Sequence, residues 1–299
     1  MYTYNIIIPH KNSPKLLQRC LDSIPHRDDL HIIVVDDNSD PNKVDFGHFP
    51  GYDRDDVELI FTKEGKGAGY ARNVGLENTN SEWVLFSDSD DFYIDGFLDI
   101  LDQNLDPNQD VIYFSINCYD SKTQKYTDAY RHIRDKIEGY SIGKSDLDSI
   151  RYHINNPWCK LVRMDYIKKY NIRFEEIIRG NDVLFSFQVG YLTNRIKVIP
   201  NRLYTYTLNY QGLSLGKWNS KKYRCYFSNM YKMNQFYRFI GKSSWKYNIF
   251  LKFKKLLLKN KNDIFALVRI IISYFWTYIT HGYYQNYYIN VLKSKSQIR

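Results

Sequence analysis

Three carboxylates lie close together in the run Asp88-Ser89-Asp90-Asp91. Clustered carboxylates repel one another unless a cation lies between them. A hard divalent ion such as Mg²⁺ or Mn²⁺ accepts such oxygen ligands and often binds the oxygens of a diphosphate as well. A solvated turn with capping aspartates gives the same pattern without any ligand. Because the run directly follows the apolar residues 83–86, its place at the end of a strand favours a metal and nucleotide site.

Two more polar groups directly follow apolar runs. Residues 4–8 and 31–35 are short, apolar and rich in β-branched side chains, so each is predicted to be a buried strand. The residues that follow them include Pro9 and the polar side chains of Asn12, Asp36 and Asp37. A carboxylate in such a place accepts hydrogen bonds from a base N–H or a ribose hydroxyl. An Asx turn that closes the strand is the alternative interpretation of the aspartate pair.

A glycine-rich segment, Gly65-Lys66-Gly67-Ala68-Gly69, precedes Tyr70-Ala71-Arg72-Asn73. It contains neither GxxxxGK[ST] nor GxGxxG, so neither a P-loop nor a dinucleotide fingerprint is predicted. Gly67 lies at the flexible start of a helix, and Arg72 lies on the first turns of that helix. A guanidinium there is expected to reach a base carbonyl or a phosphate near the strand ends.

These polar groups need a scaffold that brings them together. Apolar runs predict strands at residues 4–8, 31–35, 57–61, 83–86 and 111–116, with helices between them. This alternation is typical of an α/β fold with a mostly parallel central sheet flanked by helices. The carboxyl ends of parallel strands share one edge, where ligands bind. All three polar groups are therefore expected at the same edge.

The order of four motifs resembles the family 2 inverting glycosyltransferases, which have the GT-A (Rossmann-like) fold. The motifs are strand-Pro-x-x-Asn, strand-Asp-Asp-x-Ser, Gly-x-x-x-x-Arg-Asn and strand-Asp-x-Asp-Asp. The resemblance implies that Asp37 and Arg72 bind the nucleotide, usually through uracil. It also implies that Asp90 contacts the ribose or diphosphate, and that Asp91, together with Asp90, binds Mn²⁺ or Mg²⁺. Pro9, Asn12, Asp36 and Gly67 are expected to line the same nucleotide site.

The resemblance continues in the second half of the chain, to about residue 215. The segment from Trp158 to Leu161 resembles the family's Trp-x-Lys-Leu, and Gly180-Asn181-Asp182 resembles its Gly-Glu-Asp. This implies that Asp182 is the general base. The residues expected near the acceptor are Trp158, Lys160 and Asn181. Without the resemblance, Asp182 reads as a helix N-cap.

Two residues depart from the family pattern. Lys11 stands where the family usually has Tyr, which puts the packing of the donor base in doubt. Asn181 stands where the family usually has Glu, which removes a charge beside the predicted base and leaves acceptor recognition open.

The implied reaction moves a sugar from a nucleotide sugar, with a UDP-sugar expected, to a hydroxyl of a glycan or lipid-linked acceptor. The anomeric centre is inverted, and the product belongs to cell-surface polysaccharide biosynthesis. Two alternatives remain. Clustered aspartates also serve metal-dependent nucleotidyltransferases, and a pI near 9.1 with basic and aromatic residues interleaved suggests a non-enzymatic nucleic-acid-binding protein. The acidic body of the chain counts against the second.

The division of the chain follows its charge. Residues 1–215 are predicted to be the catalytic domain, with a nucleotide-binding half at 1–115 and an acceptor half at 116–215. Residues 216–299 are predicted to be a basic, aromatic helical extension. Residues 220–299 hold 16 Lys and Arg and a single acidic residue, Asp263, whereas residues 1–219 hold 26 basic and 32 acidic residues.

The extension is expected to meet an anionic surface. In residues 249–261 one helical face is apolar and is bordered by lysines, a pattern typical of a helix that lies on an anionic membrane. Its apolar residues are Ile249, Phe250, Phe253, Leu256 and Leu257. The alternative is that these helices pack on the catalytic domain. The apolar run 264–279 is short for a membrane span.

Four widely spaced cysteines, without a CxxC pair, predict neither a zinc site nor a disulfide framework. The N-terminal residues lack a basic segment followed by a long apolar one, so no signal peptide is predicted. Together these features predict a cytoplasmic protein, with peripheral contact at the inner face of the cell membrane as an extension of that prediction.

Overall fold

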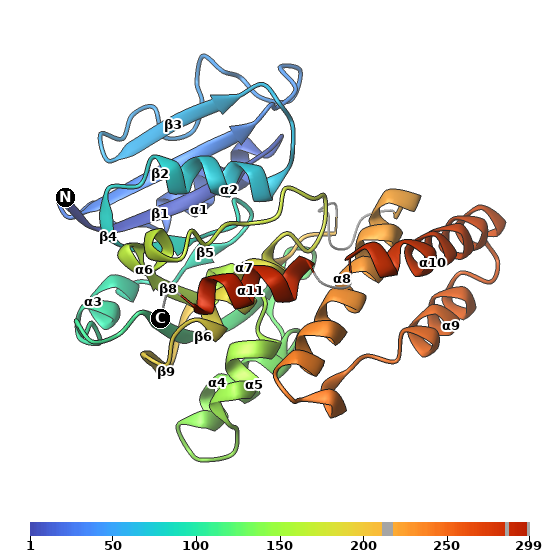
Figure 1. Ribbon diagram of the computed structural model, residues 1–299. Helices are drawn as coiled ribbons and strands as arrows, with labels where there is room; N and C mark the ends of the chain where they lie inside the picture. The colour runs from blue at the N-terminus through green and yellow to red at the C-terminus, as the bar shows by residue number, and fades with distance from the viewer. Residues whose placement is uncertain (211–217, 285–286, 298–299) are drawn as a thin grey trace.

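A single mixed sheet forms the centre of the computed structural model, which describes residues 1–210, 218–284 and 287–297. Its strand order is β3-β2-β1-β4-β8-β6-β9-β5, with β7 paired to β6. The strands are β1 (Tyr2–His10), β2 (Leu30–Asp37), β3 (Val57–Thr62), β4 (Ser81–Phe86), β5 (Phe92–Tyr93), β6 (Val111–Asp120), β7 (Lys125–Tyr126), β8 (Lys160–Arg163) and β9 (Ile196–Leu208). Helices cover this sheet domain on both sides (Figure 1).

The first four strands in chain order form the parallel part of the sheet. Ile6 of β1 pairs with Ile32 of β2 on one side and with Leu85 of β4 on the other. All three side chains are completely buried, so these strands are apolar on both faces, as parallel strands must be. Because β1, β2 and β4 run in the same direction, their polar carboxyl ends meet at one edge, as the sequence predicts.

The second half of the sheet is mixed, where the sequence analysis expected mainly parallel pairing. Strand β8 runs antiparallel between β4 and β6, and β6 runs parallel to β9. The chain reaches β8 after the helices α4 and α5 and the 3₁₀ turn η1, and so returns into the sheet in the opposite direction. Strand β6 confirms the expected strand at 111–116 and extends it to Asp120.

The remaining elements are helical. Those of the sheet domain are α1 (Pro14–Asp22), α2 (Ala68–Glu77), α3 (Phe97–Asp102), α4 (Arg131–Tyr140), α5 (Leu147–His153), η1 (Pro157–Cys159), α6 (Met164–Lys169) and α7 (Asp182–Tyr191). Those of the extension are α8 (Ser220–Phe239), η2 (Ser243–Trp245), α9 (Ile249–Lys259), α10 (Ile264–Tyr284) and α11 (Tyr287–Ser296). Helix α2 packs directly on β1, because Gly75 lets the helix backbone approach the buried Ile7.

The extension is docked on the sheet domain through α8. Phe236 of α8 stacks on Phe187 of α7 with ring centroids 4.0 Å apart, and Tyr237 donates a hydrogen bond of 3.1 Å to the Tyr152 carbonyl. Leu292 of α11 completes this apolar cluster. Helices α9 and α10 lie on the far side of α8, away from the sheet (Figure 1). None of the described helices is long and apolar enough to cross a membrane.

The close packing of α2 on β1 predicts a steric effect of Gly75→Ala. A Cβ at residue 75 would lie 2.4 Å from the Ile7 Cγ2, so the helix that carries Arg72 must shift. Overpacking of this kind costs about 1–3 kcal/mol of unfolding free energy. Urea denaturation measures the loss. Gly139→Ala is the matched control, because a Cβ there meets Ser145 at an ordinary 3.5 Å; equal stability of the two variants would contradict this packing.

Candidate functional site

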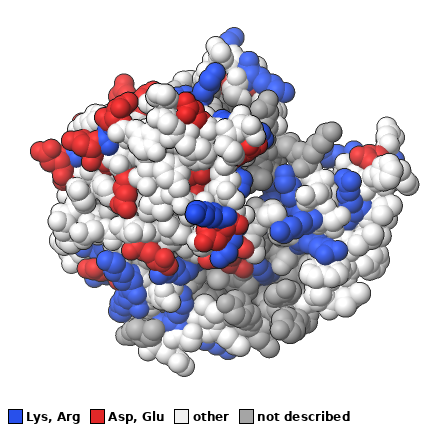
Figure 2. Space-filling model, turned by 90° about the horizontal axis from the view of Figure 1, so that it is seen from above, with Lys and Arg blue, Asp and Glu red and all other residues white. Residues whose placement is uncertain are grey.

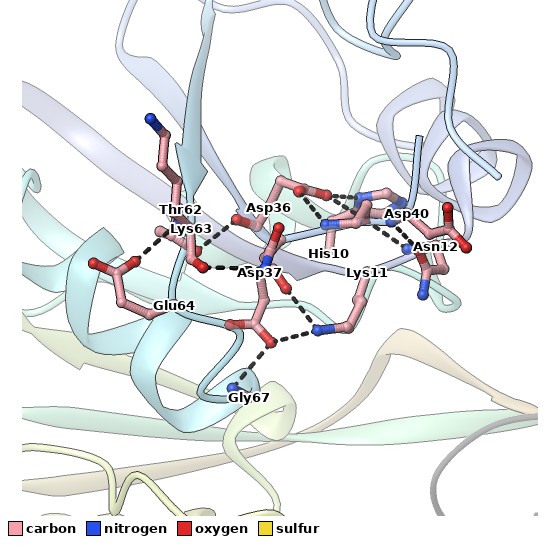
Figure 3. Close-up of polar contacts among 12 residues, drawn as sticks. His10, Lys11, Asn12, Asp36, Asp37, Asp40, Thr62, Lys63, Glu64 and Gly67 are labelled. Atoms are coloured by element: carbon pink, nitrogen blue, oxygen red, sulfur yellow. Dashed lines mark hydrogen bonds and ion pairs between the residues drawn. The ribbon is translucent and has the colours of Figure 1, made fainter. Parts of the chain in front are cut away.

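Asp36 connects the carboxyl ends of β1 and β2 through hydrogen bonds. His10 Nδ1 lies 2.8 Å from its carboxylate, and Ser39 donates from its backbone N–H at 2.9 Å and from its hydroxyl at 2.6 Å (Figure 3). Burial would raise the pKa of Asp36, but the hydrogen bonds from His10 and Ser39 outweigh it and lower the pKa. The side chain therefore fastens the end of β1 to the end of β2, and the sequence expectation of a nucleotide contact shifts to its neighbour.

Asp37 faces the glycine-rich segment. Its Oδ2 accepts a hydrogen bond of 3.0 Å from the Gly67 N–H, and Lys11 Nζ lies 3.3 Å from the same oxygen (Figure 3). Its Oδ1 is buried and has no hydrogen-bond partner among the described residues. A buried acceptor without a donor is costly, so this oxygen is poised to accept an N–H from a ligand. Lys11, the departure from the family pattern, thus neutralises Asp37.

Pro9 and Asn12 shape the loop beside this carboxylate. Pro9 lies buried in β1, where it pairs with Val35. Asn12 has a left-handed backbone, φ 57°, and its Oδ1 accepts 2.7 Å from the Asp40 N–H. Both residues therefore hold the β1 and β2 loops in place, and the contact to a ligand falls to their neighbours.

The acidic run forms a compact cluster. One carboxylate oxygen from each of Asp88, Asp90 and Asp91 lies within 4.8 Å of the others. Burial and the charges of Asp90 and Asp88 raise the pKa of Asp91 well above its ordinary value. Burial and Asp88 likewise raise the pKa of Asp90, against the hydrogen bond from Asn209. A cation between these carboxylates would relieve their mutual repulsion.

Burial separates the roles within this cluster. Asp91 is completely buried, and its two oxygens accept from Tyr204 Oη at 2.7 Å and the Thr207 N–H at 2.6 Å. Asp88 and Asp90 are partly exposed. Asp88 and Asp90 thus face outward with Asp91 beneath them, and each of the three offers one oxygen to a metal ion. The expectation that Asp91 and Asp90 bind the metal stays a prediction.

Arg72 joins the two halves of the sheet domain. Its Nη2 donates to Asp88 at 2.5 Å, and its Nη1 donates to Asn181 Oδ1 at 2.9 Å. The guanidinium also lies over the Phe174 ring, 5.3 Å from the centroid. Arg72 therefore supplies the positive charge beside the acidic run and ties it to the loop before α7. In this arrangement it supports the nucleotide site through Asp88.

Asp182 begins helix α7 beside this link. Burial raises the pKa of its carboxyl, whereas the charge of Arg72 opposes the shift. The side chain remains partly exposed, so it stays accessible to a ligand. The preceding Gly180 has a φ of +70°, and a Cβ there would collide with Asn229 of α8. The extension thus packs tightly against the loop that presents Asp182.

Trp158 and Lys160 are buried residues that pack behind the candidate site. Trp158 stacks on Tyr204 with centroids 5.3 Å apart. Lys160 is fully buried and donates to the carbonyls of Ile154, at 2.9 Å, and Asn156. Burial lowers its pKa. Neither side chain reaches the surface, and Asn181 is also buried and accepts a hydrogen bond from Arg72. The expected contact of these three residues with an acceptor stays a prediction.

Sequence reasoning missed the partners that come from β9 and α8. Tyr204, Thr207 and Asn209 all contact the acidic run from more than a hundred residues away. Lys232 of α8 forms an ion pair of 2.8 Å with Glu175 in the loop before α7. No sequence motif marks these residues, since only the folded sheet brings them to the site.

A second group of metal-type ligands occurs among the described residues: His26, Asp55 and Asp56. Two of the three are exposed, and Asp56 is already paired with Arg54 at 2.6 Å. That ion pair supplies the charge balance a cation would otherwise provide. The acidic run at the end of β4 is therefore the better candidate for a metal.

Comparison with known proteins gives a family match. The family model described as "Glycosyl transferase family 2" matches residues 5–171 of the chain. This range contains β1 from residue 5 onward, β2, α2 and the acidic run.

Curated relatives carry related names. The chain is 25% identical over 218 residues to the uncharacterized glycosyltransferase YibD of Escherichia coli (strain K12), covering 70% of this chain and 62% of that protein. It is also 25% identical over 219 residues to the poly(ribitol-phosphate) β-N-acetylglucosaminyltransferase TarS of Staphylococcus aureus (strain MW2), covering 71% of this chain and 36% of TarS. The chain thus spans less than two thirds of the length of these relatives.

Solved structures show the same fold. S. aureus TarS 1–349 in complex with UDP-GlcNAc superposes with a TM-score of 0.61 at 18% identity, covering 99% of this chain and 90% of that one. The same fragment with UDP gives a TM-score of 0.57 at 18% identity, covering 99% and 92%. This likeness confirms the GT-A fold, with a central sheet flanked by helices and a helical C-terminal part.

The exposed carboxylates predict which variant loses a divalent cation. Asp90→Asn removes a charged oxygen from the cluster, so the affinity for Mn²⁺ is expected to fall at least tenfold, about 1.4 kcal/mol. Electron paramagnetic resonance of free Mn²⁺ measures the binding. Asp55→Asn, in the other acidic group, is the matched control and should bind normally. If Asp55→Asn lost Mn²⁺ binding while Asp90→Asn kept it, the metal would bind at the group of His26, Asp55 and Asp56, which contradicts the assignment.

Proposed function

The chain belongs to glycosyl transferase family 2, and on this premise we propose that it transfers a sugar from a nucleotide-sugar donor to a hydroxyl of a glycan or lipid-linked acceptor, with inversion. The observation that carries the proposal is one connected network. Asp37 binds Gly67 at the start of α2, and Arg72 on α2 binds both Asp88 and Asn181. Asn181 directly precedes Asp182 at the start of α7, so the proposed base lies beside this network.

The donor proposed is a UDP-sugar. The unpartnered Oδ1 of Asp37 suits the N–H of a uracil ring, with Lys11 and the Gly67 N–H fixing the other oxygen. The solved TarS complexes with UDP-GlcNAc and with UDP support a uridine nucleotide in a protein of this fold. Gly67 leaves open space beside Asp37, since a Cβ there would meet nothing within 4 Å.

Mn²⁺ or Mg²⁺ is the proposed cofactor, held by Asp88 and Asp90 with Asp91 beneath them. Partly exposed carboxylates that lie this close together fit a hard divalent cation, and burial and Asp88 raise the pKa of Asp90. When bound, such an ion stabilises the charge of the departing diphosphate, so no protonated side chain is needed on the leaving-group side. Arg72 keeps one of these carboxylates in place through its ion pair with Asp88.

Asp182 is the proposed general base. It takes the proton of the acceptor hydroxyl while that oxygen forms a bond to the anomeric carbon. The bond from this carbon to the phosphate oxygen breaks at the same time, and the nucleotide diphosphate leaves with the electron pair. A single displacement by an oxygen from the opposite side inverts the anomeric centre. A raised pKa brings the carboxyl closer to working pH, which suits a base.

The acceptor proposed is a growing cell-surface polysaccharide. The printed name of TarS describes sugar transfer to poly(ribitol-phosphate), and another relative is named as a succinoglycan biosynthesis protein. We place the reaction in the cytoplasm, because all four cysteines are free, as in proteins of reducing compartments. The family membership favours this enzyme over the nucleic-acid-binding and nucleotidyltransferase alternatives.

The base assignment predicts the phenotype of Asp182→Asn. This variant keeps the shape of the side chain but cannot accept the proton, so transfer should fall about 100-fold or more while UDP binding persists. Radiolabelled sugar transfer and UDP calorimetry measure the two effects. Asp165→Asn, at the first turn of α6, is the control. Near wild-type transfer by Asp182→Asn would overturn the assignment.

The released product separates the proposed reaction from its closest alternative. Sugar transfer from a UDP-sugar releases UDP, whereas nucleotidyl transfer releases pyrophosphate. Coupled assays for both products, run on the same reaction with Mn²⁺ present, are expected to detect UDP alone. Pyrophosphate formed in step with substrate loss would contradict the proposal.

The raised pKa of Asp182 predicts the pH profile. Because the base works only when ionised, the rate should fall as pH falls through this pKa, at a higher pH than an ordinary aspartate with a pKa of about 3.9 would give. The profile of kcat/KM between acidic and neutral pH measures it. The residual activity of Asp182→Asn should lack this acid limb; an unchanged limb would assign the titration to another group.

A further inference from the structure

Helix α10 presents two opposite faces. One face packs on α8 through small or compact side chains at helical spacing: Ala266, Ile270, Ser273 and Thr277, all buried. Ser273 Oγ donates 3.1 Å to the Ser220 carbonyl at the start of α8, and Thr277 bonds back to the Ser273 carbonyl at 2.7 Å. This seam fixes the orientation of α10 about its axis and therefore decides which side chains face outward.

The opposite face, called here the α10 outer face, is apolar and open. Its side chains are between 39% and 79% exposed, although all of them are large and hydrophobic. They are Ile264, Phe265, Val268, Ile271, Ile272, Phe275, Trp276, Tyr278 and Ile279. At 100° per residue these positions form one continuous arc centred opposite the buried seam. A contiguous apolar surface of this kind marks a contact with another apolar phase.

Helix α9 does not provide this surface, in contrast to the sequence expectation. The face containing Ile249, Phe253, Leu256 and Leu257 packs inward against α8 and α10. Phe253 stacks on Tyr274 of α10 with centroids 4.2 Å apart. Most of the apolar face expected on α9 is therefore packed within the extension, and of its five residues Phe250 alone remains exposed.

Basic side chains accompany the α10 outer face. Arg269 of α10 is exposed, and Arg224 of α8 lies over the Trp276 ring, 4.6 Å from its centroid. The neighbouring helix α9 adds the exposed Lys254, Lys255 and Lys259. At the right of Figure 2, Lys and Arg gather beside a hollow next to the sheet domain, and the surface beyond them is mostly uncharged.

We propose that the α10 outer face inserts into the headgroup region of an anionic lipid bilayer, with the flanking Lys and Arg side chains on the lipid phosphates. Trp276 and Tyr278 suit the boundary between headgroups and acyl chains. The helix lies in the interface and does not cross it, because its opposite face is bonded to α8 and no described helix is long and apolar enough to span.

Charge selects the bilayer over a second copy of the chain. A symmetric dimer through this face would bring two sets of flanking cations together. Residues 220–299 offer only Asp263 as an acidic counterpart to 16 Lys and Arg. An anionic bilayer offers negatively charged headgroups over an apolar interior. The apolar interior can therefore receive the α10 outer face while the headgroups pair with the basic side chains.

The proposal also links the membrane to the reaction site. Helix α8, which carries α10, donates from Asn229 to the Arg179 carbonyl at 3.0 Å, beside the loop that precedes Asp182. A chain bound through α10 would therefore hold Asp182 at a fixed position relative to the bilayer. This geometry suits an acceptor that is itself attached to lipid, a consequence that rests on the proposed function.

Vesicle sedimentation of the full chain tests the proposal. The vesicles contain phosphatidylcholine with or without phosphatidylglycerol, and the variant is the triple change Phe265→Ser, Ile272→Ser and Phe275→Ser. The wild-type chain should sediment with anionic vesicles, less at high salt, and with a blue shift of Trp fluorescence. The triple variant should lose at least tenfold in binding. Lys254→Gln with Lys255→Gln should weaken binding to anionic vesicles in particular.

Ile142→Ser is the matched control, because Ile142 is equally exposed but belongs to the sheet domain. It should bind vesicles as the wild type does. Retained UDP binding and an unchanged melting temperature show that the triple variant is folded. Wild-type binding by the triple variant would overturn the proposal. So would a wild-type dimer in light scattering that the triple variant converts to a monomer without any vesicle binding, which assigns the face to a second copy.

Discussion

Repulsion among three carboxylates at the end of β4 is the constraint on which the site depends. Asp88, Asp90 and Asp91 cannot all be ionised close together unless positive charge or hydrogen-bond donors surround them. Arg72 supplies positive charge beside Asp88, and Tyr204 and Thr207 of β9 donate hydrogen bonds to Asp91. The negative charge that remains on the open side is the charge that the proposed divalent cation would balance.

The same constraint explains why distant parts of the chain converge. Arg72 reaches from α2 to the acidic run and also to Asn181, so the donor half and the loop before α7 share one guanidinium. Tyr204 supports Asp91 and is in turn stacked on Trp158. Position 181 is Asn, where the family usually has Glu, so the hydrogen bond from Arg72 goes to a neutral side chain. Asp88 is therefore the acidic partner of Arg72.

The sequence predicted what is local. Apolar runs followed by polar residues marked the ends of β1, β2 and β4, because burial on both faces of a parallel strand leaves a clear pattern. The antiparallel β8 and the long pairing of β6 with β9 were missed, since no local pattern encodes the partner of a strand. The motifs also gave no information about exposure, because Asp91 and Lys160 are both fully buried in the folded chain.

The charge balance at the sheet edge is tested most directly by a crystal structure with UDP and Mn²⁺, measured for the anomalous signal of manganese. A single strong manganese peak is expected next to the diphosphate, bound by Asp88 and Asp90. Asp91 should remain hydrogen-bonded to Tyr204 beneath it, and the uracil N–H should donate to Asp37. A peak at His26, Asp55 and Asp56, or a nucleotide bound away from Asp37, would contradict it.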